Sequence, residues 1–287
     1  MRITLLLLSL ILLGCSDNKT DFEKYNELEQ KAMLEFKDKK YEKALSNFEK
    51  AIDLKPKEDV SIYFYASASA LNAGKNKKAE ELLIASIHNT NASKDYFLNF
   101  NEFDNFRNKK LFTEIENDYE NHISQFYENL KHPKIYREVD SLMELDQEIR
   151  KKNIDREEMA RIDSLNITRL IKITKEYGWQ KKGWLVLWHQ RGTYGQDNYV
   201  WNFFKPYIDE QIAKGNVEKS FWTMFEEEKS IIINKEQIYG LYSNQLNQFP
   251  IKDIANVDKR RTENGLPPLW YMEKVYGVEL PIEYKKL

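Results

Sequence analysis

The sequence LMELDQEIR, residues 142–150, opens the stretch around which this chain is organised, and that stretch runs on to residue 269. Leu142, Leu145 and Ile149 recur at the spacing of one helical face. Farther along, polar side chains fall at positions where a purely structural core would carry apolar ones. We therefore predict that residues 132–287 form a mainly α-helical domain that holds a set of polar residues for binding or chemistry.

Two helices of this domain place polar residues among apolar ones. The helix that ends at Tyr177 puts Asn166 inside an apolar stripe, and Gly178 is a typical residue to stop it. A dense apolar run over residues 184–189 predicts a buried helix that ends in His189. A histidine at that position is either a hydrogen-bonded core residue or an acid–base group.

One small β-hairpin is expected in this otherwise helical domain. The β-branched residues 231–233, the turn after them and the alternating residues 237–241 carry its signal. Alternation would place Gln237 and Tyr239 on the same face of the hairpin. That face is predicted to turn toward His189 and either Arg150 or Arg260, which would form one polar pocket. The alternative is that Tyr239 is a core residue and Gln237 is solvated at the edge.

The glutamates before the hairpin and the C-terminal tail have plainer interpretations. Glu226, Glu227 and Glu228 are interpreted as a solvated helix end. Residues 253–264 predict a charged helix that a glycine stops. The tail over residues 266–287 is rich in proline and tyrosine and is expected to wrap over the surface.

The first residues have the features of an export signal. Arg2 precedes an apolar run over residues 3–13, which is too short to span the roughly 30 Å of a bilayer core as a helix. A positive start, a short apolar core and a small residue before Cys15 are the parts of a secretory signal. Cys15 is the only cysteine, so the body of the chain has no thiol for a disulfide, a zinc site or a nucleophile. An ordinary signal peptide with an incidental cysteine is the alternative.

Residues 12–15, Leu-Leu-Gly-Cys, resemble a bacterial lipobox. The resemblance implies that residues 1–14 are a signal peptide, that Cys15 becomes the acylated N-terminus, and that residues 15–23 form a tether to the membrane. Several acyl chains anchor a protein stably where one does not. Ser16 and Asp17 resemble the export signal of Bacteroidetes surface lipoproteins, which implies a lipid-anchored location in the cell envelope, in the outer membrane.

Small, aromatic and helix-ending residues recur at regular spacing after the tether: Ala32, Tyr41, Ala44, Phe48, Ala51 and Pro56. They resemble a tetratricopeptide repeat, and a weaker copy spans residues 59–87. Two such units bury too little surface alone, so the apolar face of residues 101–115 is expected to cap them as a degenerate third unit. We therefore predict tetratricopeptide-like helical hairpins over residues 24–131.

The inward positions of these hairpins are expected to be Glu29, Met33, Phe64 and Ala68. Tetratricopeptide grooves that clamp a carboxylate tail use lysine and asparagine there, so carboxylate-clamp binding of a peptide is not expected. Two interpretations of the hairpins remain. They are either a docking surface for envelope proteins or a packing module that supports the second half.

An ordered set of polar and turn residues runs through the second half: Asp146, Gln147, Arg150, Asp163, Asn166, Tyr177, Gly178, Trp179, His189, Gln237, Tyr239, Gly240, Arg260, Arg261, Gly265, Leu266, Pro268 and Leu269. The set resembles an uncharacterised bacterial domain family of unknown function, with the pattern D-Q-x-x-R, Y-G-W-P, Q-H, Q-x-Y-G, R-R and G-L-x-P-L. The chain departs from that pattern at Gln180, Trp188 and Arg191. If the family's polar set is catalytic, several members are missing here.

Composition and motifs exclude several function classes. The formal net charge is −2, so a broad nucleic-acid footprint is not expected. The sequence holds no phosphate-binding glycine loop, no zinc-protease motif and no serine elbow. Its four histidines are too dispersed to indicate a metal site, and no cofactor is expected.

Two function classes remain. The first is a membrane-tethered binding or scaffold protein of the cell envelope, with these candidate binding residues: Gln147, Asn166, Gln237, Tyr239 and Arg260. The second is an envelope enzyme acting on a small polar substrate, with His189, Asp146 and Arg150 as candidate catalytic residues. Because polar positions of the family pattern are lost, the binding interpretation is favoured.

Overall fold

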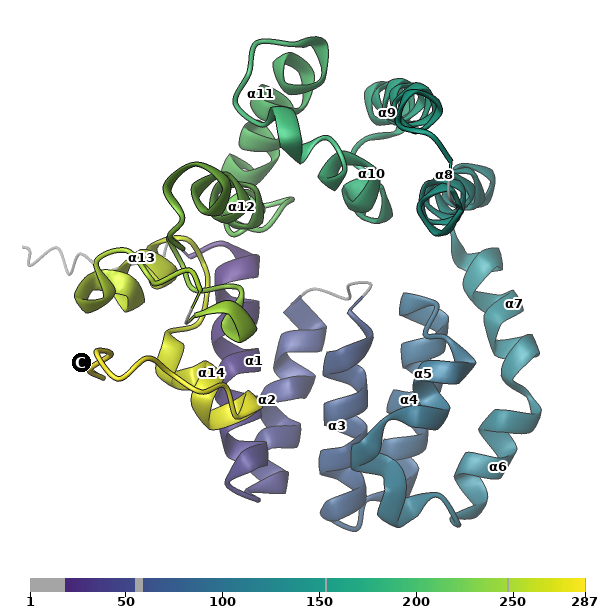
Figure 1. Ribbon diagram of the computed structural model, residues 1–287. Helices are drawn as coiled ribbons and strands as arrows, with labels where there is room; N and C mark the ends of the chain where they lie inside the picture. The colour runs from purple at the N-terminus through teal and green to yellow at the C-terminus, as the bar shows by residue number, and fades with distance from the viewer. Residues whose placement is uncertain (1–18, 55–58, 153, 247, 287) are drawn as a thin grey trace, which may run out of the picture.

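The computed structural model describes residues 19–54, 59–152, 154–246 and 248–286 (Figure 1). The predicted signal peptide and Cys15 lie outside these residues. The described chain is mainly helical, as predicted. No helix within it is both long enough and apolar enough to cross a membrane.

The chain begins with two helical hairpins, formed by α1 (Asp21–Lys37) with α2 (Tyr41–Leu54) and by α3 (Val60–Asn72) with α4 (Asn76–Thr90). Thr20 and Glu23 start α1 in a capping box, in which each side chain accepts a hydrogen bond from the other residue's backbone N–H. Ala44 and Ala51 on α2 have no exposed surface, so neighbouring helices approach closely there. Phe48, on the same helix, is fully buried as well.

Four short elements follow the hairpins: α5 (Lys94–Asn99), the 3-10 helix η1 (Asn101–Phe106), α6 (Lys110–Asn117) and α7 (Tyr119–Asn129). Phe103, Leu111 and Phe112 are buried, as their apolar spacing predicted. The ring of Phe103 lies 5.3 Å from that of Phe64 on α3, between ring centroids. These elements therefore close the open end of the second hairpin.

The second half has its own core, built by five helices: α8 (Pro133–Lys151), α9 (Arg156–Tyr177), α10 (Trp184–Trp188), α11 (Tyr199–Ala213) and α12 (Thr223–Asn234). Leu170, Phe204 and Phe225 are fully buried at its centre. Gly178 ends α9 with a positive φ of 86°, a conformation that favours glycine, as the sequence predicted. Figure 1 shows these helices arching above the N-terminal hairpins.

The predicted β-hairpin is wrong. Residues 231–233 continue α12, which ends only at Asn234. Among the described residues, the one β contact is an isolated bridge between Gln237 and Ile251. The three isoleucines favour a strand by local propensity, but Ile231 is buried one turn after Glu227 on the same helix, so tertiary packing decided the conformation.

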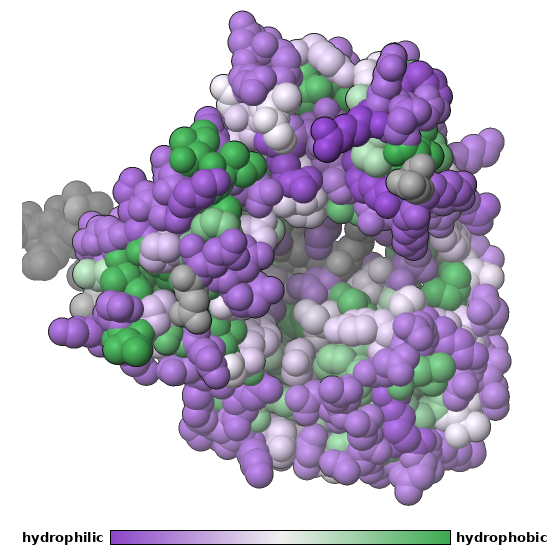
Figure 2. Space-filling model, viewed as in Figure 1, coloured by the Kyte–Doolittle hydropathy of each residue, from purple (hydrophilic) through white to green (hydrophobic). Residues whose placement is uncertain are grey.

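The tail does more than wrap over the surface, which corrects that expectation. It contains α14 (Leu269–Tyr276), preceded by α13 (Val257–Glu263). Tyr271 and Val275 are each 3% exposed and belong to the core of the N-terminal hairpins, where α14 packs against α1. The last helix therefore joins the two halves and closes a ring of helices (Figure 1). Figure 2 shows that the surface is hollowed between the halves.

Candidate functional site

A buried carboxylate on α8 holds together the first group of predicted site residues. The Asp146 side chain is 1% exposed, and Arg150 donates to it at 3.0 Å. The second terminal nitrogen of Arg150 donates to both carboxylate oxygens of Asp163 on α9, at 2.9 and 3.0 Å. Gln147 donates to Asp146 at 2.9 Å, and His189 Nδ1 lies 2.6 Å from the same oxygen, Oδ2. We call these five residues the Asp146 network.

The network gathers two carboxylates and one guanidinium beside His189. One guanidinium, on Arg150, serves the two carboxylates of Asp146 and Asp163, which leaves an excess negative charge beside His189. The contact to His189 Nδ1 is within ion-pair distance but is not aligned as a hydrogen bond. The same residue could exchange a proton with a bound molecule, because its side chain keeps 13% exposure.

Asn166 faces inward, as its place in the apolar stripe predicted. It is 3% exposed on α9, and its amide nitrogen has no hydrogen-bond partner in the described part of the chain. A buried donor without a partner costs stability, about 1–3 kcal/mol.

A second buried carboxylate holds the other group of predicted residues. Glu227, on α12, has no exposed surface and accepts hydrogen bonds from three backbone N–H groups of one loop. The donors are Ile238, Tyr239 at 3.0 Å and Leu241 at 2.8 Å. The interpretation of Glu227 as part of a solvated helix end is therefore wrong. A run of three glutamates gives no sign of which one faces inward, since that depends on where the loop lies.

The predicted binding residues of this region also hold the loop over residues 237–242. The Gln237 side chain accepts from the Tyr242 N–H at 2.9 Å and donates to the Tyr242 and Phe249 carbonyls at 3.2 and 3.0 Å. Arg260 donates to the Ile238 carbonyl at 3.2 Å. Together with Glu227, these side chains form what we call the Glu227 network.

Two further side chains complete that network. Arg261 is 2% exposed and donates to the Tyr239 carbonyl at 2.6 Å, and burial lowers the pKa of its guanidinium to about 10. The Tyr239 hydroxyl donates to Glu226 at 2.6 Å. Burial, and then the hydrogen bond to Glu226, raises the pKa of Tyr239 well above its ordinary value, so the phenol stays neutral. The Glu227 network therefore holds one loop, residues 237–242, in place.

Apart from Asn166, the structure places the predicted site residues in two networks rather than around one pocket. Asp146, Arg150 and His189 lie together, whereas Gln237 and its neighbours hold the loop after α12. Arg191, two residues after His189, lies 3.3 Å from Glu228, the neighbour of Glu227. Neither of the two pockets described below is lined by His189 or Gln237.

The larger pocket lies between the two halves of the molecule, and we call it the central pocket. It has a volume of about 860 Å³, and the N-terminal helices contribute Phe22 and Thr90 to it. The second half contributes mostly apolar side chains: Trp179, Trp184, Leu185, Phe221, Met224, Leu241 and Leu266. The sequence carried a partial signal for this pocket in the tryptophan-rich apolar run of α10, but the contribution of α1 and α4 could not be read from it.

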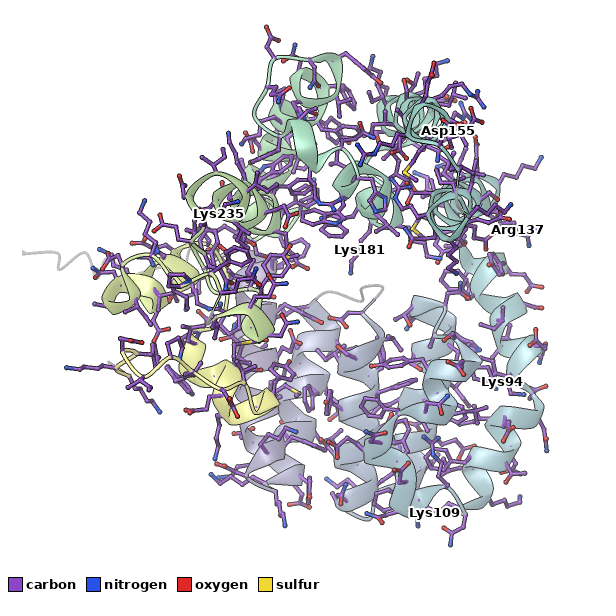
Figure 3. All side chains as sticks on the ribbon, viewed as in Figure 1. Lys94, Lys109, Arg137, Asp155, Lys181 and Lys235 are labelled. Atoms are coloured by element: carbon purple, nitrogen blue, oxygen red, sulfur yellow. The ribbon has the colours of Figure 1, made fainter. Side chains whose placement is uncertain are left out.

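The charged residues of the central pocket are two lysines and one glutamate, Lys181, Lys182 and Glu218. Lys181 is exposed and projects into the opening between the halves (Figure 3). Burial opposes the charge of Lys182, but hydrogen bonds to Asp140 and Tyr136 outweigh it and raise the pKa of the ammonium. Lys182 therefore remains cationic at neutral pH.

No group of three or more histidine, cysteine, aspartate or glutamate side chains in the described residues could hold a metal ion. Comparison with models of known families, with curated proteins and with solved structures finds no match to this chain.

Proposed function

We propose that this chain is a lipid-anchored binding protein of the bacterial cell envelope, and that the central pocket is its ligand site. The observation that carries the proposal is the pocket's position and size. Ligand pockets are typically about 300–1,000 Å³, mostly apolar, and often lie between structural units. The central pocket, at about 860 Å³ and lined from both halves, has these properties.

The lining indicates the class of ligand. Trp179, Trp184 and Phe221 offer aromatic surface for an apolar or aromatic body. Lys182 is paired with Asp140, whereas exposed Lys181 projects into the opening, so Lys181 is the cation that an acidic group of the ligand would meet. We infer a small amphipathic ligand that carries an acidic group.

The ring of helices gives each half of the chain a part in this proposal. In this proposal the first two hairpins are tetratricopeptide-like, and they support one wall of the pocket while their outer faces remain available to envelope proteins. The second half, with its resemblance to an uncharacterised domain family, supplies most of the lining. Small buried residues on the hairpins, such as Ala44 and Ala68, support the repeat assignment.

Binding can be tested with a fluorescent probe that has the inferred chemistry, anilinonaphthalene sulfonate, and with its uncharged relative, phenylnaphthylamine. We expect the sulfonate to bind more tightly, and Leu185→Arg to abolish binding of both by filling the pocket. Leu165→Arg is the matched control, because Leu165 is 57% exposed on the same half. Equal binding to both variants would place the ligand elsewhere.

The membrane tether rests on Cys15 and its lipobox-like surroundings. Cys15→Ala should move the protein from the membrane fraction to the soluble fraction and remove the mass of the acyl chains. If detergent partitioning and mass both stay unchanged, the chain is not a lipoprotein.

The alternative is an envelope enzyme that uses His189. The contact of 2.6 Å between His189 and buried Asp146 favours it, because an acid–base group needs such a partner. His189 also lies one helical turn after Leu185, which lines the central pocket. Mass spectrometry of ligands recovered after incubation decides between the two: an enzyme would change them chemically, and His189→Gln would stop the change.

A further inference from the structure

A second pocket lies farther along α12 than the central pocket. Thr223 and Met224 of this helix line the central pocket. Five later residues of α12 line the second pocket: Glu226, Lys229, Ser230, Ile233 and Asn234. Its volume is about 430 Å³, half that of the central pocket, and we call it the Tyr194 pocket.

The walls of the Tyr194 pocket are aromatic and aliphatic. Tyr194 and Trp201 form one side, with ring centroids 5.1 Å apart in an edge-to-face arrangement. Ile233, on α12, and Ile238, in the loop after it, add aliphatic surface to the lining. Ile238 belongs to the loop that Glu227 holds, so this wall is fixed by a buried carboxylate.

Two opposite charges face this apolar space without pairing with each other. Glu226 accepts a hydrogen bond from Tyr239, which orients the carboxylate but leaves its charge uncompensated. Lys229 makes no ion pair in the described part of the chain, and its ammonium lies 5.9 Å above the Tyr194 ring. Glu226 and Lys229 are three residues apart on one helix, so their Cβ atoms lie only about 5–6 Å from each other.

The third charged residue of the pocket is already neutralised. Lys205 is paired with both oxygens of Asp209, at 2.8 and 2.7 Å. The charges available to a ligand are therefore one anion, on Glu226, and one cation, on Lys229. They lie beside a surface that suits a small apolar or aromatic group.

We propose that the Tyr194 pocket binds a free α-amino acid with an aromatic or large apolar side chain. The ligand's ammonium would pair with Glu226, its carboxylate with Lys229, and its side chain would lie between Trp201 and the two isoleucines. A zwitterion of this size satisfies both charges at once, whereas a simple anion or cation would leave one of them facing a like charge. This site is independent of the function proposed for the central pocket.

The test uses the purified full-length protein, isothermal titration calorimetry and three probes. L-phenylalanine carries both charges, L-phenylalaninamide lacks the carboxylate, and N-acetyl-L-phenylalanine lacks the ammonium. Each charge-assisted hydrogen bond contributes enough for roughly a tenfold change in affinity. We therefore expect phenylalanine to bind about tenfold more tightly than either derivative.

Two variants assign each charge to its residue. Lys229→Met should weaken phenylalanine about tenfold and leave phenylalaninamide unchanged, because the amide has no carboxylate to lose a partner. Glu226→Gln should weaken phenylalanine and phenylalaninamide alike and leave the N-acetyl derivative unchanged. Lys235→Met, which alters an exposed lysine that does not line the pocket, is the control and should bind like the wild type.

The proposal is overturned if phenylalanine shows no binding at millimolar concentration, or if all three probes bind equally. It is also overturned if Lys229→Met and Lys235→Met have the same effect. If Glu226→Gln melts at a much lower temperature than the wild type, the comparison of Lys229→Met with its control Lys235→Met still tests the proposal. Leu185→Arg separates the two sites, since it should abolish probe binding in the central pocket and leave phenylalanine binding intact.

Discussion

Replacing Glu227 by glutamine tests whether one buried carboxylate holds the loop that lies between the two pockets. The carboxylate accepts two N–H groups on Oε2, from Ile238 and Tyr239, and one on Oε1, from Leu241. Glutamine can accept with only one terminal oxygen and carries an NH₂ donor in place of the other. In its better orientation the oxygen keeps the first two donors, and the NH₂ then faces the Leu241 N–H.

The expected loss follows from these three hydrogen bonds. One buried N–H loses its acceptor, which costs about 1–3 kcal/mol. The other two bonds lose the ionic contribution, which is about half their strength. We therefore expect Glu227→Gln to lower the free energy of unfolding by about 3–4 kcal/mol.

Urea unfolding followed by circular dichroism measures this loss, and hydrogen exchange locates it. The Leu241 amide should lose protection first. Glu228→Gln is the matched control: Glu228 is partly exposed and contacts the Tyr242 hydroxyl and Arg191, so about 1 kcal/mol or less is expected. Equal losses in the two variants, or full protection of the loop amides in Glu227→Gln, would refute the reasoning.

Three other outcomes are expected. Asp146→Ala should cost about 3 kcal/mol in urea unfolding, because it leaves Arg150 and His189 beside an emptied buried site; a loss below 1 kcal/mol would mean that the Asp146 network is not structural. Ala44→Glu should lower the free energy of unfolding by about 4 kcal/mol or more, because it buries an unpaired charge. Lys43→Glu, at an exposed position, is the control and should leave the melting temperature nearly unchanged. Similar melting temperatures of the two variants would contradict the close packing of α2. Burial and the neighbouring His122 ring, whose Nδ1 lies 2.9 Å from His88 Nε2, lower the pKa of His88 below 6.5. The unfolded chain therefore binds that proton more readily, and the free energy of unfolding should fall as the pH drops through about 6.5. His88→Gln should flatten this pH dependence, and an unchanged pH profile in that variant would argue against it.

Local sequence patterns predicted the helices well where the pattern and the burial agree. Gly178 stops α9 because glycine accepts a positive φ, and that requirement belongs to the residue itself. Phe103, Leu111, Phe112 and Ile115 are buried as predicted, although the structure divides them between η1 and α6 rather than placing them on one helix. The inward position of Asn166 followed from the same spacing.

The same patterns failed where long-range contacts choose between local alternatives. Residues 231–233 have the β-branched composition of a strand, yet they extend α12, since Ile231 finds its buried neighbours on a helix. The tail gave no strong periodic signal, and α14 buries Tyr271 and Val275 by packing against the N-terminal hairpins, where α1 lies more than 200 residues earlier in the chain. A single sequence does not show which distant helix will supply such a partner.

The sequence by itself determined that the described chain is mainly helical and that Asn166 is polar within apolar surroundings, because these properties depend on neighbours a few positions apart. Only the tertiary structure decided how the polar residues are grouped. It gave Asp146 and Glu227 separate roles, since a buried carboxylate is stable only where donors from other elements reach it. It also created the central pocket, whose walls come from α1, α4 and the second half and meet only when the ring of helices closes.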